Sequence, residues 1–288
     1  MLKTILLTVL ALLAFAGNSV LCRLALSDGV IDAASFTSIR LLSGAIFLLF
    51  LVTIRTKKRV NIKAGNWLSA FFLFLYAAAF SYAYVTLDTG TGALILFGSV
   101  QVTMILSSLV KGKRLILVEW VGLCVAFLGL IILLMPGATA PSLTGFTLMA
   151  VSGIAWGFYT LAGRGSKTPL IDTANNFLRT LPFIALLTLL TLDNTQISNQ
   201  GILIAIVSGT VTSGLGYAIW YTALSGLTVT HAAIIQLAVP IIAALGGVIF
   251  ANETINIGLI TSSFLVLGGV LIVIIGKQYV EKLARYKT

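Results

Sequence analysis

A succession of ten long apolar runs constrains this fold more than any other feature of the sequence. A helix needs roughly 20 apolar residues to cross a bilayer core that is about 30 Å thick. Only 9% of the 288 residues are charged and 59% are hydrophobic, which is too little charge for the water-facing surface of a soluble domain. The sequence therefore predicts an all-α integral membrane protein with ten transmembrane helices. The predicted spans are 3–22, 33–54, 65–86, 91–110, 115–135, 143–163, 173–192, 201–223, 229–250 and 257–276.

The basic residues predict how the chain lies in the membrane. With the N-terminus inside, the inner segments hold 15 of the 18 Lys and Arg residues, and the outer segments hold only Arg23. Short cytoplasmic loops carry such an excess of positive charge. We therefore expect both the N- and C-termini to be cytoplasmic, in a bacterial-type inner (plasma) membrane.

Composition also argues against several classes of function. The net charge of +10 does not indicate a nucleic-acid partner, because the basic residues lie between apolar runs as juxtamembrane charges do. Cys22 and Cys124 offer no metal-ligand spacing. Carboxylates lie in loops or at span edges, and His231 is the one histidine, so no cluster for acid–base or nucleophilic chemistry forms. We expect no enzyme, no metal site and no cofactor.

The chain repeats itself at an offset of 139 residues, which pairs Arg40 with Arg179 and Tyr82 with Tyr221. The first run, which by itself resembles a signal peptide, thereby has a partner near Trp156 and is expected to be retained. Five spans per half is an odd number, so the second half enters the membrane inverted. We predict two inverted five-helix repeats, residues 1–138 and 139–288, within a single membrane domain. Inverted repeats are typical of secondary transporters, with the substrate site between the halves.

With these motifs the sequence resembles the drug/metabolite transporter superfamily, in its ten-helix EamA-type branch. Each half has a Gly-containing pair in its first helix, Gly17-Asn18 or Trp156-Gly157, and an Arg in its second. The second half continues with Tyr221-Thr222-Ala223-Leu224, Pro240, Asn252-Glu253 and Gly268-Gly269, whereas the first half departs from the pattern at Ala16, Gln101 and Gly112-Lys113.

The resemblance implies an exporter of amino acids or similar small polar metabolites that works by alternating access. A nucleobase, nucleotide-sugar or drug carrier of the same fold is an alternative, as is a membrane receptor or scaffold that does not transport. The partners expected are a small-molecule substrate and the lipid bilayer. The oligomeric state stays open, a monomer included.

Arg40 and Arg179 are the two charges well inside spans, where a charge is costly and usually faces a cavity or a partner. They are candidates for a gate, one toward each mouth, or for a structural role in which each guanidinium bonds free carbonyls or extends toward the interface.

Aromatic and amide side chains at mid-depth are candidates for a cavity, because amides should not face lipid and mid-depth aromatics have no interfacial role. The alternative is that they join helices. The substrate-binding candidates are Asn18, Tyr82, Gln101, Trp156, Tyr217 and Tyr221. The mid-depth set also includes Phe15, Tyr76, Phe80, Phe97, Tyr159, Trp220 and Gln236.

Overall fold

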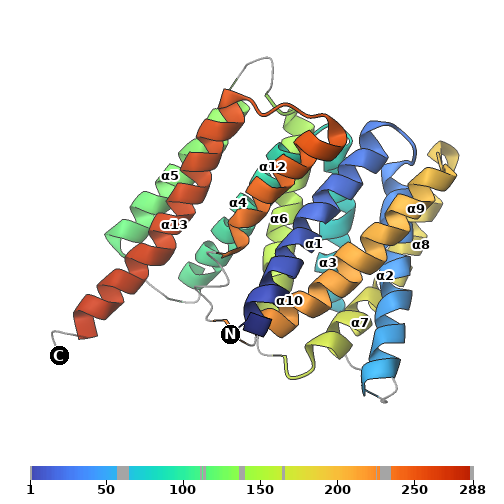
Figure 1. Cartoon of the computed structure of the whole chain (residues 1–288), viewed down its shortest axis with the longest axis horizontal. Helices are drawn as coiled ribbons and strands as arrows, with labels where there is room; N and C mark the ends of the chain where they lie inside the picture. The colour runs from blue at the N-terminus through green and yellow to red at the C-terminus, as the bar shows by residue number, and fades with distance from the viewer. Residues whose placement is uncertain are drawn as a thin grey trace.

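The computed structural model describes most of the chain, and its described part is almost entirely helical (Figure 1). The described residues are 2–56, 65–110, 112, 115–135, 140–163, 166–224, 226–227 and 235–285, with side chains to 276. His231 lies outside them. The helices are α1 (Leu2–Ser27), α2 (Ala33–Thr56), α3 (Trp67–Tyr84), α4 (Thr89–Val110), α5 (Leu117–Leu134), α6 (Leu143–Gly163), α7 (Pro169–Arg179), α8 (Leu181–Leu190), η1 (Leu192–Asn194), α9 (Asn199–Val207), η2 (Ser208–Leu215), α10 (Gly216–Leu224), α12 (Ala238–Ala251) and α13 (Ile257–Arg285).

Each predicted span overlaps one of these helices or a short series of them, which confirms the predicted membrane fold. Residues 229–234 of the ninth predicted span lie outside the described residues. In the described part, eight helical segments are long and apolar enough to cross a bilayer, and α12 is a shorter apolar helix. The seventh span is divided into α7 and α8 at Thr180. The division is explained by Pro182, since proline lacks the N–H that an uninterrupted helix needs there and its ring clashes with the preceding turn.

The eighth span contains a π-helical segment, η2, between α9 and α10. π-Helical segments are rare in proteins, and those that do occur are often found at functional sites. Small residues let η2 approach α2 closely, because a Cβ built on Gly209 would lie 2.2 Å from the carbonyl oxygen of Arg40. The side chains that follow Gly209 are thereby brought against the middle of α2.

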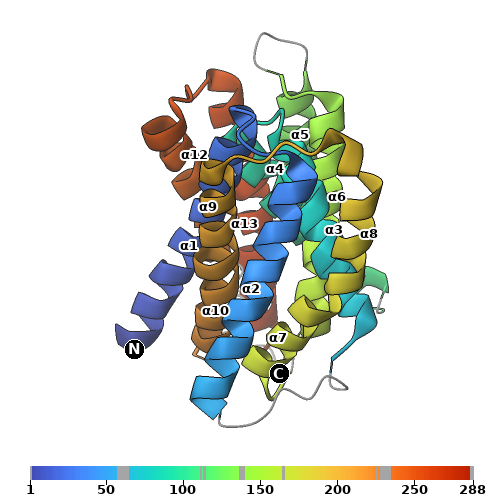
Figure 2. The ribbon, with the colours of Figure 1, turned by 90° about the vertical axis from the view of Figure 1, so that its right-hand side faces the viewer.

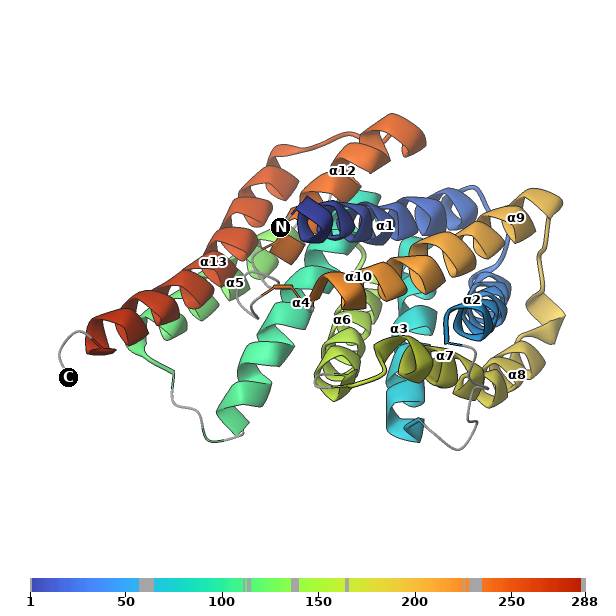
Figure 3. The ribbon, with the colours of Figure 1, turned by 60° about the horizontal axis from the view of Figure 1, so that its bottom comes forward.

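Equivalent helices of the two halves make equivalent contacts with the opposite half. α3 packs on α6 as α10 packs on α1, and α4 packs on α6 as α12 packs on α1. α5 pairs with its counterpart α13, and α2 packs against α7 and α8. Seen from one end of the bundle, the α5–α13 pair lies at one side and α8 at the other (Figure 3).

The direction of the helices agrees with the inverted repeat. α1 runs from the end of the bundle that holds both termini toward the opposite end, and α6 runs back toward the termini (Figures 1 and 2). The protein is therefore an integral membrane protein whose second half is inverted relative to the first. The division at residues 138 and 139 and the cytoplasmic location of the termini stay predictions.

Glycines also form a close helix contact between α5 and α13. A Cβ on Gly269 would lie 2.5 Å from the backbone nitrogen of Ala126 and from the carbonyl oxygen of Gly122. The adjacent Gly268 has nothing within 4 Å of the same position. Only one residue of the Gly268-Gly269 motif therefore faces the partner helix, as small residues do at membrane helix interfaces.

Candidate functional site

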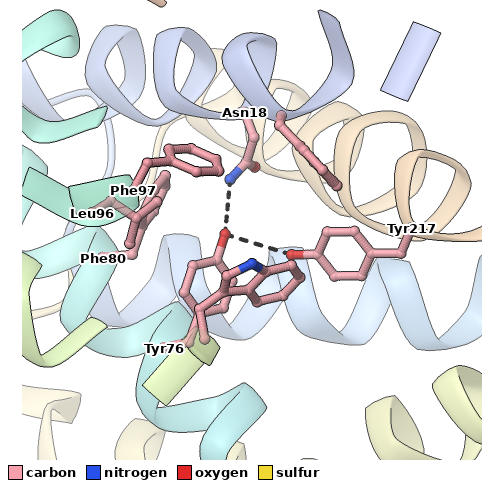
Figure 4. Close-up of a pocket in the computed structure, with 8 residues that line it drawn as sticks. Asn18, Tyr76, Phe80, Leu96, Phe97 and Tyr217 are labelled. Atoms are coloured by element: carbon pink, nitrogen blue, oxygen red, sulfur yellow. Dashed lines mark hydrogen bonds between the residues drawn. The ribbon is translucent and has the colours of Figure 1, made fainter. Parts of the chain in front are cut away.

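A small enclosed cavity lies between the two halves, near the middle of the helices that surround it (Figure 4). Its volume of about 10 Å³ is close to the minimum for one water molecule, so the site is nearly closed. Both halves contribute to its wall. The lining residues are Phe15 and Asn18 from α1, Tyr76 and Phe80 from α3, Leu96 and Phe97 from α4, Trp156 from α6 and Tyr217 from α10.

The hydroxyl of Tyr76 is the centre of the polar contacts at this cavity. It accepts hydrogen bonds from Arg40 Nη2 at 3.1 Å and from Asn18 Nδ2 at 3.5 Å, and the hydroxyl of Tyr217 lies 3.5 Å away. Ser152 of α6 donates to the carbonyl oxygen of Tyr76 at 3.0 Å. One tyrosine thus connects α1, α2, α3, α6 and α10.

The π-helical segment supplies the next contacts outward. Asn18 Oδ1 accepts hydrogen bonds from Ser208 at 2.7 Å and Thr212 at 3.1 Å. Arg40 Nε donates to Ser213 Oγ at 3.1 Å. Because η2 presents all three hydroxyls to the interior, its irregular geometry holds the two polar side chains that meet at Tyr76.

Arg40 is a buried cation with incomplete hydrogen bonding. Arg40 is only 1% exposed to solvent. Its guanidinium carbon lies 5.1 Å from the centre of the Phe80 ring and 5.4 Å from that of the Tyr76 ring. Nη1 has no hydrogen-bond partner in the described part of the chain. The ion pairs found there involve Arg23 rather than Arg40. The positive charge beside the cavity is therefore not neutralised by a described carboxylate.

Aromatic rings form most of the wall, and they pack against one another across the two halves. The Trp156 ring centre lies 4.7 Å from that of Tyr76 and 4.9 Å from that of Tyr217, and the Phe15 ring meets Trp156 edge-on at 6.3 Å. Aromatic pairs prefer such tilted and edge-on arrangements. The rings close the site in this conformation, and a ligand larger than water requires them to separate.

Toward the end of the bundle opposite the termini, an ionic cluster joins four helix ends. Arg23 of α1 donates to Glu253 at 3.0 Å, to Asp88 at 3.2 Å and to the carbonyl oxygen of Tyr84 at 3.3 Å. Glu253 also accepts from the backbone nitrogen of Thr89, at the first turn of α4, at 2.9 Å. A carboxylate is favourable at a helix N-terminus, so Glu253 joins the start of α4 to Arg23 of α1.

The Asn252-Glu253 motif of the sequence is explained by this cluster. Asn252 ends α12 with a left-handed backbone (φ 51°), a conformation that asparagine tolerates better than most residues. The turn directs Glu253 back to Arg23 and Thr89. The motif therefore joins the end of α12 to α1 and α4.

Three of the six predicted substrate-binding residues, Asn18, Trp156 and Tyr217, line the cavity, and their role in binding stays a prediction. Gln101 is buried on α4, with its Nε2 lacking a partner in the described part, but it does not line the cavity. Tyr221 is partly buried against the core and also lies outside the lining.

The placement predicted for Tyr82 is wrong, because this side chain is 37% exposed and lies away from the cavity. The residue of α3 that meets the cavity is Tyr76, six positions earlier, which is about 1.7 helical turns and a different face of the helix. Tyr76, Phe80, Phe15 and Phe97 were recognisable as mid-depth aromatics, but α3 and α4 are so apolar on all sides that the sequence did not indicate which face is inward. No feature of the sequence distinguished Leu96 from the other apolar residues of α4.

The two candidate gate residues are not in equivalent positions. Arg40 reaches the interior and contacts the cavity wall, as described above. Arg179 is half-buried at the end of α7, where its guanidinium carbon lies 5.4 Å from the centre of the Trp67 ring. Arg40 is buried beside the cavity because η2 and Tyr76 provide acceptors there, and a gate role for either arginine stays a prediction.

Two inverted sets of membrane-spanning helices around a closed internal cavity define the class of this protein as a membrane transporter. The chain belongs to the EamA-like transporter family, whose model matches it twice, at residues 2–135 and 143–275. Each match covers one predicted repeat, which agrees with the drug/metabolite transporter resemblance.

Individual relatives support this assignment. An uncharacterized protein of Pseudomonas aeruginosa is 51% identical over 272 residues, or 94% of each chain. An uncharacterized transporter of Archaeoglobus fulgidus is 26% identical over 238 residues, covering 78% of this chain and 83% of that one. A solved crystal structure has the same fold, with a TM-score of 0.66 at 18% identity over 94% of this chain and 96% of that one.

Proposed function

We propose that this protein is a secondary transporter that exports amino acids or similar small polar metabolites across the inner (plasma) membrane by alternating access. Its partners are then the bilayer and a small-molecule substrate, with no nucleic acid, and a monomer suffices. The N- and C-termini lie in the cytoplasm in this proposal, following the distribution of Lys and Arg.

The observation that supports the proposal is the cavity itself. It lies between inverted halves, at the place where secondary transporters bind substrate. Its wall combines aromatic rings with the amide of Asn18 and the hydroxyls of Tyr76 and Tyr217, as small-molecule sites combine apolar walls with a few polar groups. Rocking of one half against the other would open this cavity first to one side and then to the other.

The nearly closed cavity corresponds to an occluded conformation in this cycle. Opening toward the end opposite the termini requires separation of Arg23 from Glu253, which joins α1 to the turn after α12. Because α12 packs on α1 and α4, this separation would also loosen the wall that Phe97 completes. The proposed mechanism thus couples an ionic contact at one end to access at mid-depth.

The test is transport by the purified protein in liposomes. Labelled amino acids, nucleobases, nucleotide-sugars and quaternary amines are compared at equal concentration, with protein-free liposomes as the control. We expect protein-dependent flux of an amino acid or a similar small polar metabolite. Flux of a nucleobase, nucleotide-sugar or drug alone would favour the alternative carriers. Absence of flux for all four classes with folded protein would favour a receptor or scaffold.

Direction is tested separately in cells. Overproduction of an exporter lowers the intracellular level of its substrate and raises resistance to an excess of it. Accumulation of the same solute inside the overproducing cells would contradict export while leaving transport intact.

A further inference from the structure

The polar groups around the cavity are unequally divided between hydrogen-bond donors and acceptors. Arg40 Nη2 and Asn18 Nδ2 both lie at the Tyr76 oxygen. An N–H group donates and cannot accept, so neither of these groups can accept a hydrogen bond from the Tyr76 hydroxyl. The Tyr76–Tyr217 pair still carries two phenolic protons, and at most one of them bonds within the pair. One phenolic proton is left without an acceptor among the described residues.

The other acceptors near the cavity are already engaged. Ser208 and Thr212 both approach the amide oxygen of Asn18 within hydrogen-bonding distance. None of the described residues that line the cavity is acidic. A ligand that enters this site therefore meets unsatisfied donors and finds few acceptors for its own N–H groups.

The charge of the site favours the same kind of ligand. Arg40 is fully buried, makes two hydrogen bonds to hydroxyls and leaves Nη1 without a described partner. Burying a charge without a counterion costs free energy. An anionic ligand that pairs with Arg40 would offset part of this cost and bind more tightly for that reason. An ammonium group has aromatic faces as its alternative, but the guanidinium of Arg40 already lies over the rings of Tyr76 and Phe80 and repels a second cation.

We propose that the cavity recognises its substrate by a carboxylate and has no seat for an α-ammonium group, so that organic acids are bound at least as well as the corresponding amino acids. This inference rests on the proposed transport function and specifies its substrate class. The carboxylate accepts a hydrogen bond from the remaining phenolic hydroxyl, and its charge neutralises that of Arg40. The apolar part of the substrate packs against Phe15, Trp156 and Phe97. Substrates that carry only an amine are excluded.

Three probes that share one phenyl skeleton test the inference. 3-Phenylpropionate has the carboxylate alone, L-phenylalanine has both charged groups, and phenethylamine has the amine alone. Binding to the purified full chain is measured by calorimetry and by thermal stabilisation, since a ligand stabilises the state that it binds. We expect 3-phenylpropionate to bind at least as tightly as phenylalanine, and phenethylamine at least about tenfold more weakly, as the loss of a charged hydrogen bond implies.

Variants of two arginines on α2 provide the matched control. Arg40→Gln keeps N–H donors but removes the buried charge, and it should reduce the preference for acid over amine about tenfold. Arg55→Gln makes the same change at an exposed position of the same helix and should leave the preference unchanged. The wild-type comparison stands by itself if Arg40→Gln does not fold.

The inference is wrong if neither acid is bound, if the amine is bound as tightly as the acids, or if folded Arg40→Gln keeps the full preference. These outcomes are distinct from failure of the transport proposal. Liposome flux of an amine or a neutral solute would overturn the carboxylate inference and leave transport standing. Acid binding without flux of any solute would overturn transport and leave the recognition of carboxylates standing.

Discussion

Replacing Tyr76 by Phe isolates the contribution of one hydroxyl to the stability of the central site. The ring, which lies 4.7 Å from that of Trp156, is kept. Arg40 Nη2 loses its acceptor at 3.1 Å, and a lost hydrogen bond to a charged group costs about 1.5–3 kcal/mol. The Asn18 contact at 3.5 Å is at the outer limit for a hydrogen bond and adds little. We expect the free energy of unfolding to fall by about 2–3 kcal/mol.

The matched control is Tyr84→Phe on the same helix. Tyr84 is also buried, but its hydroxyl donates to a neutral acceptor, the carbonyl oxygen of Thr89, at 3.2 Å. Such a bond is worth about 0.5–1.5 kcal/mol. Reversible unfolding in mixed SDS and detergent micelles gives both free energies. We expect a clearly larger loss of unfolding free energy for Tyr76→Phe than for Tyr84→Phe.

A double-mutant cycle with Arg40→Met shows whether the loss comes from the arginine. In the Arg40→Met background the Tyr76→Phe change should cost less than about 1 kcal/mol, because the charged donor has gone. The coupling energy between the two positions should then be about 1.5–3 kcal/mol. Costs that add to within about 0.5 kcal/mol would show that Arg40 and Tyr76 are independent, and the description of Tyr76 as the centre of the site would be refuted.

Three further predictions concern packing, closure and the geometry of Arg40. Gly269→Ala should destabilise the protein by about 1–3 kcal/mol, whereas Gly268→Ala should be neutral or stabilise it by up to about 1 kcal/mol, and equal effects in thermal melting would contradict the described α5–α13 contact. Glu253→Gln should cost about 1–2 kcal/mol, and Asp88→Asn, whose side chain is 51% exposed, less than about 0.5 kcal/mol; the reverse order would exclude Glu253 as the closing residue. Arg40→Lys should lose most transport in liposomes, because one ammonium cannot reproduce two N–H groups directed at separate hydroxyls, and full transport would show that charge alone matters.

Most of the fold was predictable because the bilayer imposes a length on every span. The apolar runs predicted the membrane helices of the described part, and the 139-residue offset predicted the two halves that the family model matches separately. The π-helical segment was not predictable, since Ser208 to Leu215 is a run of small residues whose geometry depends on the approach of α2 to Gly209. The break at Thr180 was partly indicated by Pro182, which the sequence shows directly.

The sequence indicated how deep in the membrane the residues of the candidate site lie, but not which face of each helix is directed inward. Seven of its eight lining residues belong to the set of mid-depth aromatics and amides recognised in the sequence. The choice of Tyr82 over Tyr76 failed because a helix that is apolar on every side carries no periodic signal for its inner face. Arg40 and Arg179 are equivalent in the repeat, yet only Arg40 faces Ser213 and the cavity wall, and this difference follows from the asymmetric geometry of η2.

The most direct test of the account is counterflow in proteoliposomes with the acid or amino acid that the purified protein binds. Wild type and Arg55→Gln should exchange external label for internal substrate at the same rate, and folded Arg40→Gln should exchange at least about tenfold more slowly, in line with the loss of a charged hydrogen bond. The rate should not depend on an imposed pH gradient, because no carboxylate lines the described cavity and arginine does not titrate in the physiological range. Exchange by Arg40→Gln at the wild-type rate would contradict the central claim that the cavity beside Arg40 and Tyr76 is the transport site.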